Sequence, residues 1–160
     1  MRQRFERTTR IAAPIADVFA FFGAPANLGR ITPPEMGFRI TDGPDRPLRA
    51  GDRISYRIRI MGIPIHWRTL ITRWEDSVAF ADLQERGPYR YWLHTHTFRD
   101  LGNEVEMHDL VEYELPLGVL GRLFGGWFVR RQLEAIFDYR ADVIDATFRA
   151  PDRARIRSAR

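Results

Sequence analysis

The most constraining feature of this chain is a strict alternation of side chains between residues 104 and 114. Four glutamates and a histidine occupy five of the six even positions. The odd positions hold Val105, Met107, Asp109, Val111 and Tyr113. Because successive side chains of a strand point to opposite faces of a sheet, this pattern predicts a strand with one wet face and one inner face. The odd-numbered residues, Asp109 included, are expected on the inner face.

A strand that ends at Asp100 precedes this one, and it carries two histidines. We expect Leu101-Gly102 to form a two-residue hairpin turn that pairs Asp100 with Asn103 and places His94 directly opposite Asp109. The inner face of the first strand then holds Trp92, His94, His96 and Phe98. Buried polar groups need partners, and an acid opposite an imidazole supplies one. The hairpin therefore predicts a polar cluster within an apolar and aromatic face.

The strands that precede this hairpin show the same alternation. The inner positions of the strand predicted over 53–60 are Ile54, Tyr56, Ile58 and Ile60. Turns at 61–62 and 75–76 are expected to connect it to strands over 63–71 and 78–84. The inner positions of those two strands are Ile63, Ile65, Trp67, Thr69, Ile71, Phe80, Asp82 and Gln84. Successive hairpins of this kind predict an antiparallel meander with one consistent inner face.

Further elements are predicted at both ends of the meander. Strands are expected over 3–11 and 36–41, with short helices over 14–22 and 26–30 between them. After a glycine-rich segment, apolar residues recur at helical spacing over 127–148. The stripe of this long amphipathic helix is Val129, Leu133, Ile136, Phe137, Arg140, Ile144 and Phe148. Its apolar face is expected to pack against the sheet.

The composition is that of a globular protein, with 44% hydrophobic and 29% charged residues in a chain of 160. We expect one domain over residues 1–148 and a basic tail over residues 149–160. The tail holds five arginines and one aspartate, which account for the whole formal charge of +4. A solvated terminus is the simplest interpretation of such a tail.

Several function classes are excluded or disfavoured by the residues present. The chain has no cysteine and no lysine, which excludes disulfides, thiol catalysis and Schiff-base chemistry. No long apolar run or signal-peptide core is visible, so we expect a cytoplasmic protein without stable membrane insertion. Charges of both signs alternate across the outer face, which disfavours nucleic-acid binding. The sequence does not indicate an oligomeric state.

The predicted order of elements and several local motifs resemble a known superfamily. The motifs lie at residues 62–67, 80–84, 87–89 and 92–98, with Asp109, Tyr113 and Pro116. They resemble the START/Bet v1-like (SRPBCC) superfamily of polyketide cyclases and lipid-transfer proteins, and within it the bacterial ligand-binding branch. The resemblance implies an α+β helix-grip fold, in which a curved antiparallel sheet of about seven strands wraps around the long C-terminal helix. It also implies a cavity for a small hydrophobic molecule such as a lipid, sterol or polyketide, with no cofactor and no metal.

Three hypotheses remain for the polar cluster of the inner face. It could be a hydrogen-bonded network that only fixes packing. It could orient a ligand in a mainly apolar pocket. The residues expected to bind that ligand are Tyr56, Trp67, Phe80, Asp82, Gln84, Trp92, His94, His96, Phe98, Met107, Asp109, Val111, Tyr113 and Arg140.

The third hypothesis is catalysis. A histidine opposed by an aspartate is a plausible general base, so His94 and Asp109 would be the catalytic residues of a cyclase or dehydratase. A metal-dependent variant is ranked below it. His94 and His96 have Cα atoms about 6.8 Å apart on one strand face, and with Asp109 they could form a two-histidine, one-carboxylate set.

Overall fold

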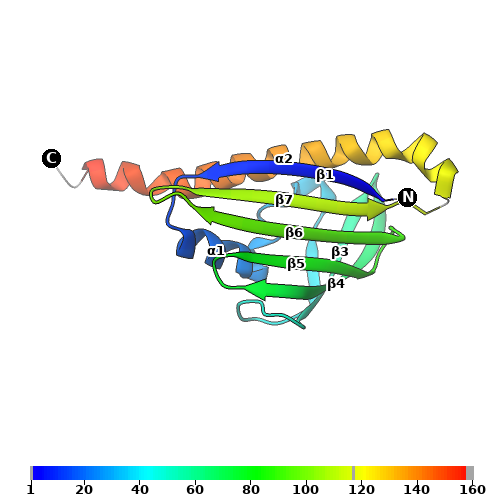
Figure 1. Ribbon diagram of the computed structural model, residues 1–160, viewed down its shortest axis with the longest axis horizontal. Helices are drawn as coiled ribbons and strands as arrows, with labels where there is room; N and C mark the ends of the chain where they lie inside the picture. Colours follow the sequence, from blue (N-terminus) through cyan, green and yellow to red (C-terminus); the bar gives the residue numbers. More distant parts are fainter. Residues whose placement is uncertain (1, 117, 158–160) are drawn as a thin grey trace.

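The computed structural model describes the backbone of residues 2–116 and 118–157, and the side chains of residues 2–116 and 126–149. Seven strands, two α-helices and two 3-10 turns follow one another along this part of the chain (Figure 1). In chain order they are β1 (Gln3–Ile11), α1 (Ile15–Gly23), η1 (Pro25–Asn27), η2 (Pro34–Met36), β2 (Arg39–Asp42), β3 (Arg53–Ile60), β4 (Ile63–Glu75), β5 (Ala79–Arg86), β6 (Tyr91–Asp100), β7 (Val105–Glu114) and α2 (Gly118–Arg157).

The strands form one antiparallel sheet in the order β1-β7-β6-β5-β4-β3-β2. From β2 to β7 each strand pairs with the next one along the chain, and β1 closes the other edge against β7. Helix α2 runs along the sheet close to β1. Helix α1 lies near the end of the strands where β1 finishes and contacts β6 (Figure 1). This arrangement confirms the expected α+β helix-grip fold.

The β6–β7 hairpin has the predicted inner face but not the predicted register. Residues 101–104 form a four-residue connection closed by the Leu101 N–H, which donates to the Glu104 carbonyl (2.9 Å). Asp100 accepts the Gly102 N–H (2.8 Å), and Gly102 adopts a φ of 89°, which glycine reaches without strain. The two-residue turn and the pairing of His94 with Asp109 were therefore wrong.

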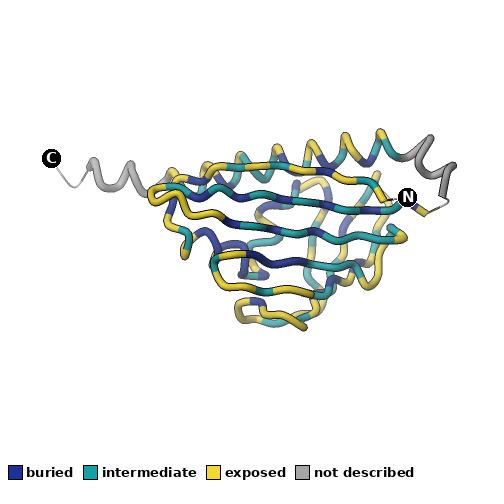
Figure 2. Tube along the Cα trace, in the orientation of Figure 1, coloured by how far each residue is buried: buried dark blue, intermediate teal, exposed yellow. Residues whose placement is uncertain are grey.

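In the observed register, His96 pairs with Asp109, and His94 pairs with Val111. The shift amounts to two residues, and side chains alternate with a period of two, so every side chain keeps its predicted face. Figure 2 shows the resulting alternation of buried and more exposed positions along the strands.

The remaining boundaries agree with the sequence to different degrees. The turn at Met61-Gly62 is confirmed, with both residues at positive φ. The next turn covers residues 76–78 rather than 75–76, because β4 continues through Glu75. β2 begins at Arg39 rather than at residue 36, since Pro34–Met36 form the 3-10 turn η2. The second short helix is also a single 3-10 turn, Pro25–Asn27.

Helix α2 is longer than predicted: its backbone is helical from Gly118 to Arg157 rather than over 127–148. On the predicted stripe Val129, Leu133, Phe137 and Ile144 are buried. The side chains of the basic tail beyond Arg149 lie outside the described residues. No helix in the described part of the chain is both long and apolar enough to cross a bilayer.

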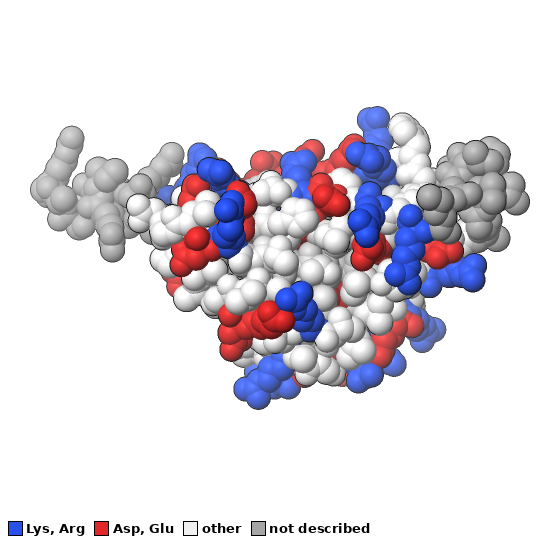
Figure 3. Space-filling view, viewed as in Figure 1, with Lys and Arg blue, Asp and Glu red and all other residues white. Residues whose placement is uncertain are grey.

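The core has two main parts on the inner face of the sheet. Aromatic residues of α1 pack against Phe80 and Phe98 at one end, as in the edge-to-face contact of Phe19 with Phe98 (5.2 Å between centroids). At the other end, the stripe of α2 packs on Phe5, Val111 and Tyr113. On the face viewed in Figure 3, arginines and acidic residues are interspersed.

Candidate functional site

A cavity on the inner face of the sheet is bounded by strands β3 to β6, the segment between α1 and β3, and α2. Its water-accessible volume is about 180 Å³, well above the 10–15 Å³ or so that one water molecule occupies on this measure. Most of its wall is aromatic or aliphatic. The polar or charged side chains among the lining residues are Thr32, Tyr56, Thr69, Asp82, Tyr89, His94, His96, Gln132 and Arg140.

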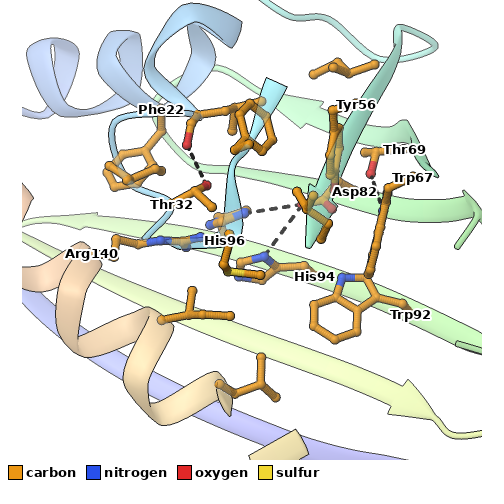
Figure 4. A pocket seen from close by; sticks show the side chains of 18 of the residues that line it. Phe22, Thr32, Tyr56, Trp67, Thr69, Asp82, Trp92, His94, His96 and Arg140 are labelled. Carbon is orange, nitrogen blue, oxygen red and sulfur yellow. Dashed lines mark hydrogen bonds and ion pairs between the residues drawn. The ribbon is translucent and has the colours of Figure 1, made fainter. Parts of the chain in front are cut away.

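The aromatic part of the wall is a connected set of rings. Tyr56 stacks on Trp67, with ring planes 12° apart, and Trp67 meets Trp92 edge to face at 5.4 Å. The Trp67 indole N–H donates to the Thr69 hydroxyl (3.1 Å), so its polar group is satisfied within the wall (Figure 4). Burial raises the pKa of Tyr56, which keeps its hydroxyl neutral. This side of the cavity thus offers a neutral, largely apolar surface.

The charged side of the cavity is formed by three neighbouring positions on β5 and β6. Asp82 pairs across the strands with His94, and His96 follows two residues later on the same face of β6. The Asp82 Oδ2 atom lies 3.8 Å from His94 Nδ1 and 3.5 Å from His96 Nε2 (Figure 4). His96 also stacks on Phe80, with 4.1 Å between ring centroids.

Asp109 lies behind the two histidines, on β7, and does not line the cavity. It is 1% exposed. His94 Nε2 makes a 2.9 Å hydrogen bond to its Oδ1, which confirms the predicted contact between these two residues. His96 Nδ1 lies 2.7 Å from the same oxygen without the alignment of a hydrogen bond. Each histidine therefore has one ring nitrogen against Asp109 and the other against Asp82.

The charges of this cluster follow from its burial and its contacts. Burial raises the pKa of Asp109, but the charge of His96 and the contacts with both imidazoles outweigh it, so the Asp109 pKa is lowered overall. Burial lowers the pKa of His96, yet the charge of Asp109 and the contacts with both carboxylates raise it overall. Burial and the neighbouring His96 lower the pKa of His94. The favoured state is an Asp109–His96 ion pair beside a neutral His94.

Arg140 reaches from α2 towards His96 (Figure 4). Its Nη1 lies 3.7 Å from Asp109 Oδ1, and its guanidinium lies over the Phe137 ring, 4.6 Å from the centroid. Among the residues whose side chains are described, the buried Nε and Nη1 atoms have no hydrogen-bond partner. Arg140 is one of the cavity-lining residues, and its ion pair with Asp109 does not give these two donors a hydrogen-bond acceptor.

The structure brings eight of the fourteen predicted site residues to the cavity wall. They are Tyr56, Trp67, Phe80, Asp82, Trp92, His94, His96 and Arg140. Phe98 and Met107 lie in the core cluster under α1, and Val111 and Tyr113 lie in the cluster under α2. Gln84 lies outside the lining: its amide binds the backbone of Tyr89, donating to the carbonyl (2.7 Å) and accepting from the N–H (3.3 Å).

Several lining residues were not predicted. Six of these sixteen residues come from the segment between α1 and β3, namely Leu28, Ile31, Thr32, Met36, Phe38 and Leu48. This segment is irregular, so no periodicity marks its inner side. Leu133 and Ile136 were recognised as members of the α2 stripe, and that stripe was the one signal that could have placed them in the wall.

Comparisons with known proteins support the fold through structure rather than sequence. No protein-family model matches the chain, and no curated protein matches it. Solved structures do resemble it. A START superfamily protein from Mycobacterium smegmatis is 13% identical, with 92% of this chain and 97% of that one covered and a TM-score of 0.70.

Two further structures show the same likeness. The Zhui aromatase/cyclase from Streptomyces sp. R1128 is 14% identical, with 90% of this chain and 92% of that one covered and a TM-score of 0.66. Ginseng major latex-like protein 151 from Panax ginseng is 13% identical, with 92% and 97% covered and a TM-score of 0.64. Together with the seven-stranded antiparallel sheet and the long helix that packs on it, these likenesses show that the chain has the START/Bet v1-like helix-grip fold.

Proposed function

We propose that the protein binds a small, mainly apolar molecule, lipid-like, sterol-like or polyketide-like, whose polar end carries an oxygen acceptor. The observation that carries this proposal is Arg140, whose Nε and Nη1 atoms are buried at the cavity without a hydrogen-bond partner. A buried donor left without an acceptor costs about 1–3 kcal/mol. A ligand with a carbonyl, hydroxyl or carboxylate oxygen would recover this energy. Transport or sequestration of such a molecule is the corresponding role.

The rest of the wall suits the apolar part of that ligand. Pockets for small molecules are mostly hydrophobic, with few polar groups that fix orientation. Here Tyr56, Trp67 and Trp92 form one continuous aromatic surface, opposite Leu133 and Ile136 of α2. Apolar contact area contributes about 25 cal/mol per Å² removed from water. The aromatic wall therefore provides affinity, and the polar residues set which end of the ligand enters first.

The test compares two tryptophans with different positions. Trp92 lines the cavity, whereas Trp127 of α2 is 71% exposed. We expect Trp92→Ala to weaken binding of a naphthalene-type fluorescent probe about tenfold or more, since roughly 60 Å² of lost contact corresponds to about 1.5 kcal/mol. Trp127→Ala should leave the affinity unchanged. Native mass spectrometry of the protein from its own host should show a co-purifying apolar molecule.

Equal losses in both variants would place the probe outside the cavity. Failure of every apolar probe, together with the absence of a co-purifying molecule, would contradict the binding function.

A second candidate function is catalysis of a cyclase or dehydratase type. It is favoured by one observation: His94 lines the cavity while its Nε2 is hydrogen-bonded to the buried carboxylate of Asp109. A carboxylate that fixes the tautomer and supports the imidazolium makes a histidine an effective general base. With an enolisable polyketone as substrate, His94→Gln should lower turnover about 100-fold or more with little loss of binding. A variant with unchanged turnover would exclude a catalytic His94.

A further inference from the structure

The two cavity histidines have an arrangement that the binding of an apolar ligand does not require. One nitrogen of each ring contacts the buried Asp109: His94 Nε2 at 2.9 Å and His96 Nδ1 at 2.7 Å. The other nitrogen of each ring is directed at Asp82 on the cavity side, as Figure 4 shows. Two imidazoles thus lie between an inner and an outer carboxylate.

The contacts with Asp82 are too long to be good hydrogen bonds. They measure 3.8 Å to His94 Nδ1 and 3.5 Å to His96 Nε2, whereas N–H···O bonds are about 2.7–3.2 Å. One possible ligand atom from each of Asp82, His94 and His96 nevertheless lies within 4.8 Å of the other two. Two nitrogens and one oxygen therefore converge on a small space that hydrogen bonds between them do not close.

We propose that Asp82, His94 and His96 form a binding site for a divalent transition-metal ion in the wall of the cavity. The separations fit such an ion. A tetrahedral centre with metal–ligand bonds of about 2.0–2.1 Å places its ligand atoms about 3.3 Å apart. The distances from Asp82 to the two histidines exceed this value by 0.2 and 0.5 Å or so. Small side-chain rotations would complete the site without a change in the backbone.

Asp109 has the position of an outer carboxylate in such a site. Histidines that bind metal usually donate their second ring N–H to a carboxylate or carbonyl, which fixes the tautomer and the ring orientation. Asp109 accepts a hydrogen bond from His94 Nε2 and contacts His96 Nδ1. This leaves Nδ1 of His94 and Nε2 of His96 free to bind the metal. Asp109 is therefore a positioning residue. The sequence suggested His94, His96 and Asp109 as metal ligands, whereas the site proposed here has Asp82 as its carboxylate ligand.

The donor set and the charges indicate the class of ion. Two imidazoles and one carboxylate suit zinc, iron(II), cobalt or nickel better than magnesium or calcium, which prefer oxygen ligands. With both imidazoles neutral, as metal binding requires, the two carboxylates exceed the single positive charge of Arg140 nearby by one negative charge. Three protein ligands leave at least one coordination position open. Because the three residues line the cavity, that position faces the space in which a ligand's oxygen would lie.

The metal site does not depend on the proposed organic ligand, so the two are tested separately. Untagged protein is stripped with a chelator and titrated with Zn²⁺ and with Co²⁺ by calorimetry near pH 8, where the imidazole ligands can lose their protons. We expect one ion per chain. The visible spectrum of the Co²⁺ form should show the strong absorption of a four- or five-coordinate centre. Asp82→Asn should weaken binding at least tenfold and His96→Gln about 100-fold.

The matched control uses the other two histidines of the chain, His66 and His108, which lie away from the cavity. The double variant His66→Gln/His108→Gln should bind the ion as the wild type does. We expect Asp82→Asn to fold, because Asp82 is partly exposed and its replacement leaves Asp109 in place. Circular dichroism checks this. Binding weaker than about 100 µM in the wild type would overturn the proposal. So would binding that survives in folded Asp82→Asn but is lost in the double variant.

Discussion

At the scale of single residues, Asp109 holds the polar cluster together. It is almost fully buried, yet its low pKa keeps it ionised, because His96 carries the compensating charge and His94 donates a hydrogen bond. Arg140 adds a second cation at 3.7 Å. A buried charge of this kind is tolerated only while its partners remain in place. Replacing Asp109 would therefore remove the hydrogen-bond acceptor of His94 and the negative charge that His96 and Arg140 contact.

We expect Asp109→Ala to lower the free energy of unfolding by about 1–3 kcal/mol, the cost of buried groups that lose their partner. It should also lower the pKa of His96, because the charge that opposes the effect of burial is gone. Chemical denaturation measures the first effect, and NMR titration of the imidazole signals in metal-free protein measures the second.

The control for this variant is Asp138→Ala. Asp138 also pairs with an arginine, Arg7, but its side chain is 63% exposed. Exposed ion pairs contribute about 0–1 kcal/mol, so the loss should be smaller than for Asp109. A His96 pKa that does not move in Asp109→Ala would show that another group sets its charge.

At the scale of elements, the connection between β5 and β6 depends on Gln84 and Gly87. The Gln84 amide makes two hydrogen bonds to the backbone of Tyr89, and this orients a residue that lines the cavity. Gly87 leaves room for that side chain: a Cβ at position 87 would lie 2.3 Å from Gln84 Oε1 and 2.9 Å from its Cγ. The glycine is therefore needed for a close approach and not for its backbone angles.

We predict that Gly87→Ala displaces the Gln84 side chain and destabilises the protein by about 1–2 kcal/mol, the contribution of two hydrogen bonds. In a Gln84→Ala background the same change should cost little, because the clashing atoms are absent. A double-mutant cycle from denaturant unfolding gives this coupling directly. Equal costs of Gly87→Ala in the two backgrounds would show that the steric contact is not the cause.

At the scale of the whole molecule, the cavity exists because α2 is held across the sheet without filling the space beneath it. Val129 and Phe137 are buried against the sheet, whereas Leu133, Ile136 and Arg140 line the cavity. The α1–β2 segment covers the other side with side chains that belong to no α-helix or strand. A larger residue on the cavity side of α2 should therefore occupy ligand space rather than disturb the packed face.

Ile136→Trp tests this arrangement. We expect binding of the naphthalene-type probe to weaken about tenfold or more, while the melting temperature changes by only a few degrees, because the added ring enters an existing cavity of about 180 Å³. Probe titration and thermal unfolding are the two measurements. A Tm that falls as far as for an overpacked core, with probe affinity retained, would show that position 136 faces packed side chains.

The sequence by itself determined which side of β3, β6 and β7 is buried. Alternation has a period of two, so even a hairpin register wrong by two residues left Trp92, His94, His96 and Asp109 on the correct face. The α2 stripe follows from local periodicity in the same way, and the successive turns predict the meander from β3 to β7, although helix ends and turn lengths do not follow. The helix-grip fold itself was implied by the resemblance to the START/Bet v1-like superfamily, because local patterns do not place β1 beside β7.

Only the tertiary structure decided which inner-face residues belong to the cavity. Phe98 and Met107 are covered by α1 and Val111 and Tyr113 by α2, and strand parity contains no information about such covering elements. Strand parity also does not distinguish Asp82 from Asp109, because it places both carboxylates on the inner face. The order of the strands places Asp82 at the cavity and Asp109 behind the histidines, because one lies on β5 and the other on β7, on opposite sides of β6.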